Sequence, residues 1–397
     1  MKRLHQLFVL PGVVVAALLA ASSAEAADCS TLPNPIYLSA SGNHKALLKQ
    51  ASAVLSAAAT PVTIVFQSNV SCVALDQMIS GTKATNSALY WDAGVETACT
   101  IPLTGVDPDV AMSDVYAPTC NAALPTTLKD FLGPIQVMTF VTHPASTETS
   151  ISADAAYVVL GFGGPPYPVA PWTDPNFLFI RPDTAGTKLL MGRSIGLPVA
   201  KWKGLPQATA GDVLTAVSAS TSPNATLGII TTELADAYRQ PNNGKQLKTL
   251  AYQHKGQSCG YFPDSSSTAF DKLNVREGRY PMWGPFHIVA RVDGTGKPTN
   301  PFVKQLTDLV NRAGVSEADK KSMTDAEAAA FAVPVCAMKV QRASEMALPT
   351  PFAPAEPCGC YFESKTGGAK AGCSVCADDT QCSGASPKCR FGYCEAR

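Results

Sequence analysis

The stretch "FIRPDTAGTKLL", Phe179 to Leu190, joins a short apolar run to a helix-forming run through a turn of small residues. Arg181 stands just before the turn Ala185-Gly186-Thr187, where the helical run begins. The start of a helix presents unpaired backbone N–H groups and a partial positive charge, so an arginine beside it is suited to hold an anion. Taken alone, the pattern fits an ordinary corner between a strand and a helix equally well.

Two other turns have a similar composition. Ser41-Gly42-Asn43 follows the strand-like run "PIYLSAS", and Asn43 is placed to cap the helical run "NHKALLKQASAVLSAA". Ser68 to Ser71 follows the β-branched run "PVTIVFQ" and precedes a helix expected to begin near Ser71. Ligands of α/β proteins bind at such turns, at the carboxyl ends of strands. Helix capping explains any one of these turns, but three together favour a binding site.

Strand-like and helical segments alternate along the chain, which predicts an α/β fold. The further strands expected are "QVMTFVT", "AYVVLGFG", "NFLFIRP", "TLGIITTE" and "FHIVARV", and "PFVKQLTDLVNRAG" is expected to be an amphipathic helix. The 397 residues include 46% hydrophobic ones, enough for a sizeable core. The 31 basic and 31 acidic residues balance, so no global field attracts nucleic acid, and charge recognition must be local.

The first residues predict export. Lys2 and Arg3 precede an apolar run from Leu7 to Ala21, and the small residues of Ala24-Glu25-Ala26 suit a signal peptidase, so residues 1–26 are expected to be removed. The apolar run is shorter than the roughly 20 residues of a membrane span. We therefore expect a protein of the periplasm, the cell surface or the surrounding medium.

All 13 cysteines follow the expected cleavage site, and disulfides are the default in an exported chain. A proline-rich linker at 351–357, "PFAPAEP", separates the main body from a Cys-rich module at 358–397. The spacing in the module also fits zinc, but export favours disulfides, and we predict no metal and no cofactor. The odd total leaves one thiol unpaired or bridged to another chain.

A hydrolase is the least favoured function. Gly192 to Gly196 matches G-x-S-x-G, with Ser194 as the serine, but no strand precedes it as a nucleophile elbow requires. The histidines outside the signal, His44 among them, stand singly in the sequence and suggest neither a metal nor a catalytic pair. The sequence therefore predicts a protein that is not an enzyme.

The order of segments resembles the phosphate-binding type of periplasmic substrate-binding protein, a type II periplasmic binding protein and the soluble receptor of an ABC transporter. The resemblance covers roughly residues 35–345. "IRPDTAGTKLL" resembles the family's arginine followed by a serine-glycine-threonine turn, "YLSASGNHKALL" and "IVFQSNVSCVAL" resemble two anion-binding turns, and "DVAMSDVYAPTC" resembles a serine-aspartate motif. The resemblance implies a binding domain at residues 27–350. One lobe is expected at about 27–138 and 250–350, and the other at about 139–249.

Carried over residue by residue, the resemblance implies a ligand site made of Asn43, Ser71, Asp114, Arg181, Gly186 and Thr187. Arg181 would give an oxyanion a charge-assisted contact. Asp114 would accept a hydrogen bond from a protonated phosphate and repel sulfate, although it also reads as a turn residue. Asp92, in "YWDAG", competes for that role, and Ala185 replaces the family's serine.

The function implied is binding of a small oxyanion, most favourably phosphate, for uptake through an ABC permease or for sensing. A second hypothesis follows from the Cys-rich tail, which resembles the disulfide knots of extracellular proteins. In that case the protein is a surface interaction or sensing protein whose tail contacts an envelope partner and which takes no part in transport.

Overall fold

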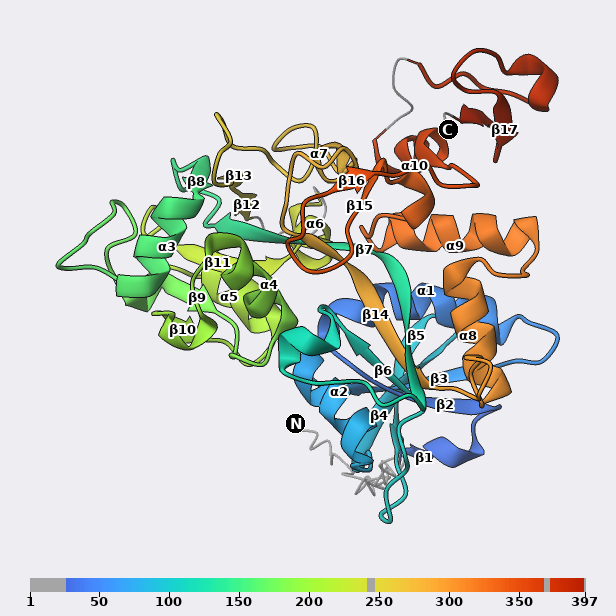
Figure 1. Cartoon of the computed structure of the whole chain (residues 1–397). Coiled ribbons are helices and arrows are strands. Elements are labelled where there is room, and N and C mark those ends of the chain that lie inside the picture. The colour runs from blue at the N-terminus through green and yellow to red at the C-terminus, as the bar shows by residue number, and fades with distance from the viewer. Residues whose placement is uncertain (1–25, 241–246, 368–371, 396–397) are drawn as a thin grey trace, which may run out of the picture.

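The computed structural model describes residues 26–240, 247–367 and 372–395, which form two α/β lobes and a disulfide-rich tail (Figure 1). The predicted two-lobed α/β fold is therefore confirmed. The expected signal peptide lies, except for Ala26, outside the described residues. Within those described ranges, no helix has the length and apolar character needed to cross a bilayer.

The first lobe is built on three neighbouring parallel strands, β2 (Pro35–Ala40), β3 (Thr63–Ser68) and β6 (Val110–Ser113). Its sheet is extended at one edge by β4 (Ser87–Asp92), β5 (Val95–Thr100) and β1 (Ala27–Asp28). The helices of this lobe are α1 (Lys45–Ser56), α2 (Ser71–Ser80), α8 (Pro301–Asn311) and α9 (Glu317–Ala329). Apolar residues of α1, α8 and α9 pack with those of β2, β3 and β14 in one core cluster.

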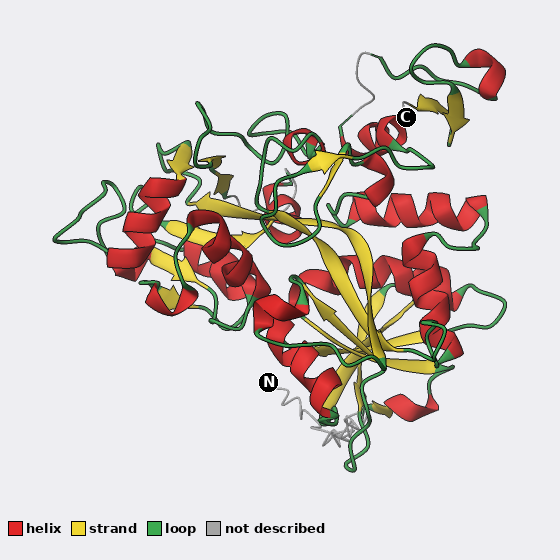
Figure 2. Ribbon diagram, in the orientation of Figure 1, coloured by secondary structure: helices red, strands yellow, loops and turns green. Residues whose placement is uncertain are grey.

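Two long antiparallel strands connect the lobes, β7 (Leu128–Thr142) and β14 (Trp283–Arg291) (Figure 2). β14 also pairs with β6 of the first lobe, and β7 pairs with β11 (Leu227–Thr231) of the second. The sheet order β1-β5-β4-β3-β2-β6-β14-β7-β11-β9-β10 is therefore continuous through both lobes. The connection between the lobes is a two-stranded ribbon.

The second lobe continues the sheet with β9 (Leu178–Ile180), β10 (Leu205–Pro206) and β12 (Lys248–Thr249), and adds a separate pair, β8 (Ser150–Ser152) with β13 (Ala251–Gln253). Its helices are α3 (Ala153–Phe162), α4 (Gly186–Ile195), α5 (Ala210–Ser218), α6 (Thr232–Arg239) and α7 (Leu273–Arg276). The chain returns to the first lobe along β14, later than the expected boundary at residue 250. The reason is that β13, which lies beyond residue 250, still pairs with β8 of the second lobe.

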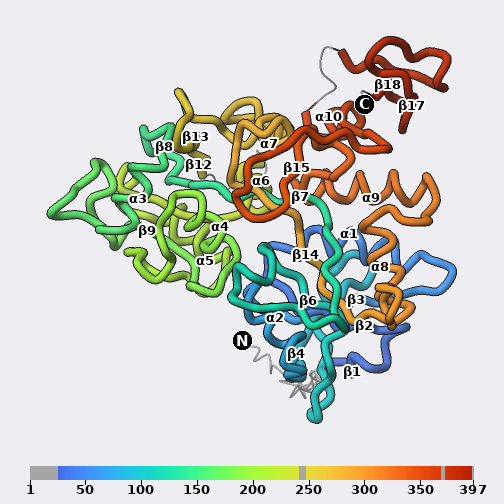
Figure 3. The backbone as a smooth tube through the Cα atoms, viewed as in Figure 1, coloured from blue at the N-terminus to red at the C-terminus, as the bar shows by residue number. Residues whose placement is uncertain are grey.

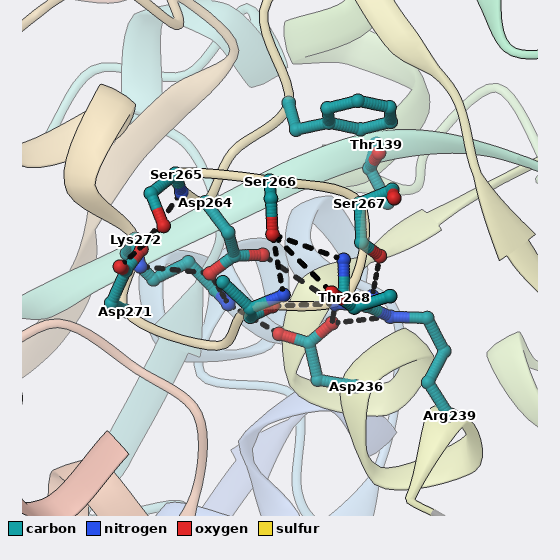
Figure 4. Close-up of polar contacts among 12 residues, drawn as sticks. Thr139, Asp236, Arg239, Asp264, Ser265, Ser266, Ser267, Thr268, Asp271 and Lys272 are labelled. Carbon is teal, nitrogen blue, oxygen red and sulfur yellow. Dashed lines mark hydrogen bonds and ion pairs between the residues drawn. The ribbon is translucent and has the colours of Figure 1, made fainter. Parts of the chain in front are cut away.

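A buried ion network fixes the segment that leads back to β14. The ammonium group of Lys272 contacts the carboxylates of Asp236 and Asp264, the latter at 2.8 Å, and Arg239 Nη2 lies 2.6 Å from Asp236 (Figure 4). Burial raises the pKa of Asp264 to about 6, although Lys272 opposes the shift. Because each of these charges has a partner of opposite sign, we interpret the network as structural.

Disulfides link the cysteines of the tail, as predicted, but the first part of the tail packs with the main body. The six disulfides join Cys29 to Cys99, Cys72 to Cys120, Cys336 to Cys358, Cys360 to Cys373, Cys376 to Cys389 and Cys382 to Cys394, and Cys259 is free and exposed. The cysteines whose spacing also fits zinc are thus engaged in disulfides.

The boundary between body and tail differs from the expected one at residue 358. Within the expected linker, Pro351 belongs to β16 (Thr350–Pro351), which pairs with β15 (Val340–Gln341). Helix α10 (Gly359–Thr366) buries Phe362 in the core of the second lobe, and Arg276 Nη1 lies 2.7 Å from Glu363 Oε1. The separate part of the tail therefore begins after α10, with β17 (Lys388–Arg390) and β18 (Tyr393–Glu395) as its strand pair.

Candidate functional site in the cleft between the lobes

The strand topology brings the predicted turns of the first lobe to one edge of the sheet. β2, β3 and β6 run parallel, with Ala40 beside Ser68 and Ser39 beside Ala111, so their carboxyl ends lie side by side. Asn43, Ser71 and Asp114 each follow one of these ends. Although they are far apart in the chain, these residues thus share the position where open α/β sheets bind ligands.

The second lobe supplies the opposite wall. β9 and β11 are parallel neighbours, with Leu178 beside Leu227 and Phe179 beside Gly228. Arg181 therefore emerges at the edge where α6 begins, and the turn after it leads into α4. The α4 and α5 helices lie across from α2 at the junction of the lobes (Figure 3), and a hydrogen bond of 3.3 Å runs from the Cys72 N–H to the Thr184 carbonyl.

Asp114 lies at the centre of the predicted group. Its backbone N–H donates to Ser71 Oγ at 3.1 Å, and its Oδ2 accepts from Asn43 Nδ2 at 3.3 Å. The same Asn43 nitrogen lies 3.3 Å from Thr187 Oγ1, which belongs to the other lobe. Asn43, Ser71, Asp114 and Thr187 are all buried, so contacts between these side chains join the two lobes.

Gly186 completes the contact between the lobes because it has no side chain. A Cβ at this position would lie 2.5 Å from Asp114 Cβ and 2.7 Å from Ser71 Oγ, closer than such atoms approach. The backbone at the start of α4 can therefore reach the start of α2 and the loop that carries Asp114. Ala185, which replaces the expected serine, has non-helical dihedrals at the N-cap and provides no side-chain cap.

Arg181 is buried in the wall of the cleft with part of its guanidinium unused. Its Nη1 donates to the Gln207 carbonyl at 2.6 Å, and its Nε has no hydrogen-bond partner among the described residues. Burial lowers the pKa of Arg181, while Asp114 and Asp212 oppose this shift. The side chain lines a cleft of about 580 Å³ between residues 42–45 and 68–70 of one lobe and residues 208–211 of the other.

The other carboxylate proposed for this site lies elsewhere. Asp92 is exposed at the tip of the hairpin formed by β4 and β5, at the far edge of the first lobe's strands. Of these two carboxylates, only that of Asp114 lies among the other predicted site residues.

His44 is a member of the group that the sequence did not reveal. It is fully buried, its Nε2 lies 3.3 Å from Asp114 Oδ1, and its Nδ1 lies 3.3 Å from Ser41 Oγ. Burial lowers the pKa of His44 despite the neighbouring carboxylate, so the ring is neutral near pH 7. The Nε2 and Oδ1 atoms approach without hydrogen-bond geometry, and neither has a partner in the described part of the chain.

More buried polar atoms without partners occur at the start of α6 and on the adjoining strand. Counting only the described residues as partners, Glu233 carries two such carboxyl oxygens, Thr231 and Thr232 one hydroxyl each, and Gln136 both atoms of its amide. Buried polar atoms are normally paired, so these unpaired ones make the junction of the two lobes a candidate place for a polar ligand. The sequence held a signal for this, because "TTEL" is a fourth strand-to-helix turn with hydroxyl side chains, like the three noted above.

Ser194 does not have the surroundings of a hydrolase nucleophile. It lies within α4, is buried, and its Oγ is 3.0 Å from the Tyr252 hydroxyl. The glycines of the G-x-S-x-G match have other roles: Gly192 packs against the Leu197 carbonyl, and Gly196 ends α4 with a φ of 75°. The motif is therefore part of a helix end.

The arrangement of lobes and strand ends defines the type II periplasmic binding protein fold. A solved structure of a phosphate ABC transporter substrate-binding protein with bound phosphate, from Clostridium perfringens, matches 76% of this chain and all of its own at TM-score 0.52 and 12% identity. An ABC-type phosphate transport receptor from Vibrio cholerae matches 75% of this chain and 99% of its own at TM-score 0.45 and 14% identity. The reduced OxyR regulatory domain of Pseudomonas aeruginosa matches 70% and 96% at TM-score 0.40 and 9% identity.

No protein-family model and no curated protein sequence matches this chain. At 12% identity, the likeness to the Clostridium perfringens protein shows the fold and leaves the ligand to be inferred from the residues of the cleft.

Proposed function

We propose that this protein is an extracytoplasmic solute-binding protein that holds a small oxyanion, phosphate first among them, between its lobes without chemical conversion. The observation that carries the proposal is the buried guanidinium of Arg181, whose Nε has no hydrogen-bond partner among the described residues and which follows the edge where β9 and β11 end. A planar guanidinium suits two-pronged contact with an oxyanion. The starts of α2 and α4 add backbone N–H groups that face the same junction.

The side chains around Asp114 favour phosphate over sulfate. Ser71 and Thr187 bring hydroxyl groups, which donate to ligand oxygens, whereas a carboxylate only accepts hydrogen bonds. A protonated phosphate has a proton to donate to Asp114, and sulfate at neutral pH has none. The ligand proposed is therefore an oxyanion that retains a proton.

The biological role proposed is delivery of this ligand to an ABC permease, or reporting of its presence. The six disulfides are compatible with an extracytoplasmic location, and the Clostridium perfringens protein of similar fold is a substrate-binding protein of an ABC transporter. The same cleft serves a sensing protein whose tail contacts an envelope partner, because both roles need the same ligand contacts.

The proposal is tested by calorimetric titration of the purified chain from residue 27 with phosphate, sulfate, citrate and glucose. Phosphate should bind, and Arg181→Ala should weaken its binding about 10- to 100-fold, since a hydrogen bond to a charged group is worth about 1.5–3 kcal/mol. Arg193→Ala is the matched control, because Arg193 is an exposed arginine of α4. Failure of every anion to bind, or equal affinity of Arg181→Ala and the unmodified protein, would contradict the proposal.

A further inference from the structure

The carboxyl group of Glu233 is buried in the second lobe and forms no hydrogen bond of normal geometry within the described residues, although its own N–H and the Thr231 hydroxyl are near enough to oppose the rise in its pKa that burial causes. The residue is 2% exposed and is the second residue of α6, and neither carboxyl oxygen has a partner in the part of the chain that the structure describes. Thr231 and Thr232, just before it, bury hydroxyl groups that likewise form no hydrogen bond of normal geometry with the described residues. A group of this kind costs folding free energy, so its retention suggests that a ligand completes it.

Glu233 belongs to the same edge of the sheet as Arg181. β9 and β11 are parallel, with Leu178 beside Leu227 and Phe179 beside Gly228, so the residues that follow the two strands leave the sheet at the same edge. Leu234, next to Glu233, lines the cleft with Arg181. The start of α6 is thus a part of the cleft wall that none of the predicted site residues occupies.

The surroundings of Glu233 favour its neutral form. Burial raises the pKa of Glu233 to about 8, and Asp114 across the cleft adds to this shift. The backbone N–H of Glu233, the Thr231 hydroxyl and the Lys272 ammonium group oppose it, but Lys272 is already paired with two aspartates. At pH 7 the carboxyl group therefore retains its proton and can act as a donor.

We propose that Glu233 is a further specificity-determining residue of the cleft, whose protonated carboxyl group donates a hydrogen bond to an oxygen of the bound oxyanion. This inference rests on the function proposed above. Once ionised, Glu233 would repel the ligand, so the site binds an oxyanion together with the proton on Glu233. Binding and ionisation are then linked: the anion holds the proton on the glutamic acid, and loss of the proton weakens binding.

The test compares phosphate binding by the unmodified protein and Glu233→Gln from pH 6.5 to 9.5. An amide keeps a donor and cannot ionise, and the ratio of the two dissociation constants cancels the ionisation of phosphate itself. The ratio of the unmodified protein's constant to that of Glu233→Gln should be flat up to about pH 7.5. Above about pH 8 it should rise toward tenfold per pH unit, the limit for one proton.

Asp76→Asn is the matched control. Asp76 is an exposed acid of α2, so its removal changes the charge near the cleft without touching the ligand. The ratio of the unmodified protein's dissociation constant to that of Asp76→Asn should stay flat over the whole pH range. Proton uptake is a second measurement that needs no variant: calorimetry at pH 8.5 in buffers of different ionisation enthalpy should show proton uptake on phosphate binding.

The outcomes separate this inference from the function on which it rests. If the unmodified protein does not bind phosphate at any pH, the proposed function fails and the inference fails with it. If phosphate binds and the ratio stays flat, or if binding at pH 8.5 takes up no proton, only the role of Glu233 is overturned.

Discussion

At the scale of single residues, Asp114 is the group on which the proposed choice of ligand depends. Asn43 donates a hydrogen bond to Asp114 Oδ2, and Ser71 Oγ accepts one from the Asp114 backbone N–H. The neutral ring of His44 lies 3.3 Å from Asp114 Oδ1. Oδ1 and His44 Nε2 both have unused hydrogen-bonding capacity in the described ranges. A fixed acceptor surrounded by donors discriminates ligands by whether they bring a proton of their own.

This arrangement predicts the effect of Asp114→Asn. Because an amide offers an N–H that a fully ionised anion can accept, the preference for phosphate over sulfate should fall by roughly tenfold, from both weaker phosphate binding and stronger sulfate binding. Competition titrations with the two anions measure this ratio. Asp92→Asn, on the exposed hairpin, should leave it unchanged; an unaltered preference in Asp114→Asn would contradict the role of the carboxylate.

At the scale of elements, the sequence predicted where strands end better than which strands pair with one another. The corner at Arg181, the start of α2 and the helix after Gly186 formed as expected, since each is encoded by a local pattern of apolar and small residues. His44 was not predicted as a candidate site residue because it stands singly in the sequence, and Glu233 was not predicted because the turn "TTEL" reads only as the end of a strand. Only the parallel pairing of distant strands brings them toward Asp114.

Two local predictions were wrong for physical reasons. "AYVVLGFG" was expected to be a strand, but it lies in α3: the Ser152 hydroxyl caps the helix by accepting from the Ala155 N–H, and Ala156, Val159 and Leu160 are buried at helical spacing. Asn43 was expected to cap α1, but its amide points to Asp114 and Thr187 instead. At α3 a local cap and helical spacing outweighed the apolar, strand-like run, and at Asn43 contacts with distant residues replaced the cap.

The close approach of α4 and α2 predicts that Gly186→Ala impairs ligand binding. The added methyl group would meet Asp114 and Ser71 well inside contact distance, so the lobes could not close fully. We expect phosphate affinity to fall at least tenfold, and the radius of gyration with ligand, measured by small-angle scattering, to stay near the ligand-free value.

Gly211→Ala, in α5 at the same cleft, is the matched control because its Cβ would lie 3.6 Å from Thr209 Oγ1, an ordinary contact. Compaction of Gly186→Ala to the same radius as the unmodified protein would show that the approach of the two helices does not depend on the glycine.

At the scale of the whole molecule, the tail is joined to the body by more than the disulfides of its own knot. Cys336–Cys358 ties α10 to the segment before β15. Glu395, buried near the end of the chain, accepts hydrogen bonds from the backbone N–H groups of Cys360 and Tyr361 at 2.9 and 2.8 Å. Its carboxylate therefore satisfies the start of α10 from a distant part of the sequence.

Removal of this contact should loosen the tail without altering the cleft. Glu395→Ala leaves two N–H groups at the start of α10 unpaired, which should lower the free energy of unfolding by about 1–3 kcal/mol. Thermal unfolding measures the loss, and calorimetry should show unchanged phosphate affinity. Lys388→Ala, an exposed change in β17, should alter neither quantity. An unchanged melting temperature in Glu395→Ala would mean that the knot stands independently of the body.

The disulfide between Cys72 and Cys120 has a consequence for the life of the protein in the cell. It joins the first turn of α2 to the 3-10 helix Ala117–Cys120, so it holds together the two segments that carry Ser71 and Asp114. A newly made chain in a reducing compartment lacks this link. Under the function proposed above, capture of the oxyanion should therefore begin only after this disulfide has formed.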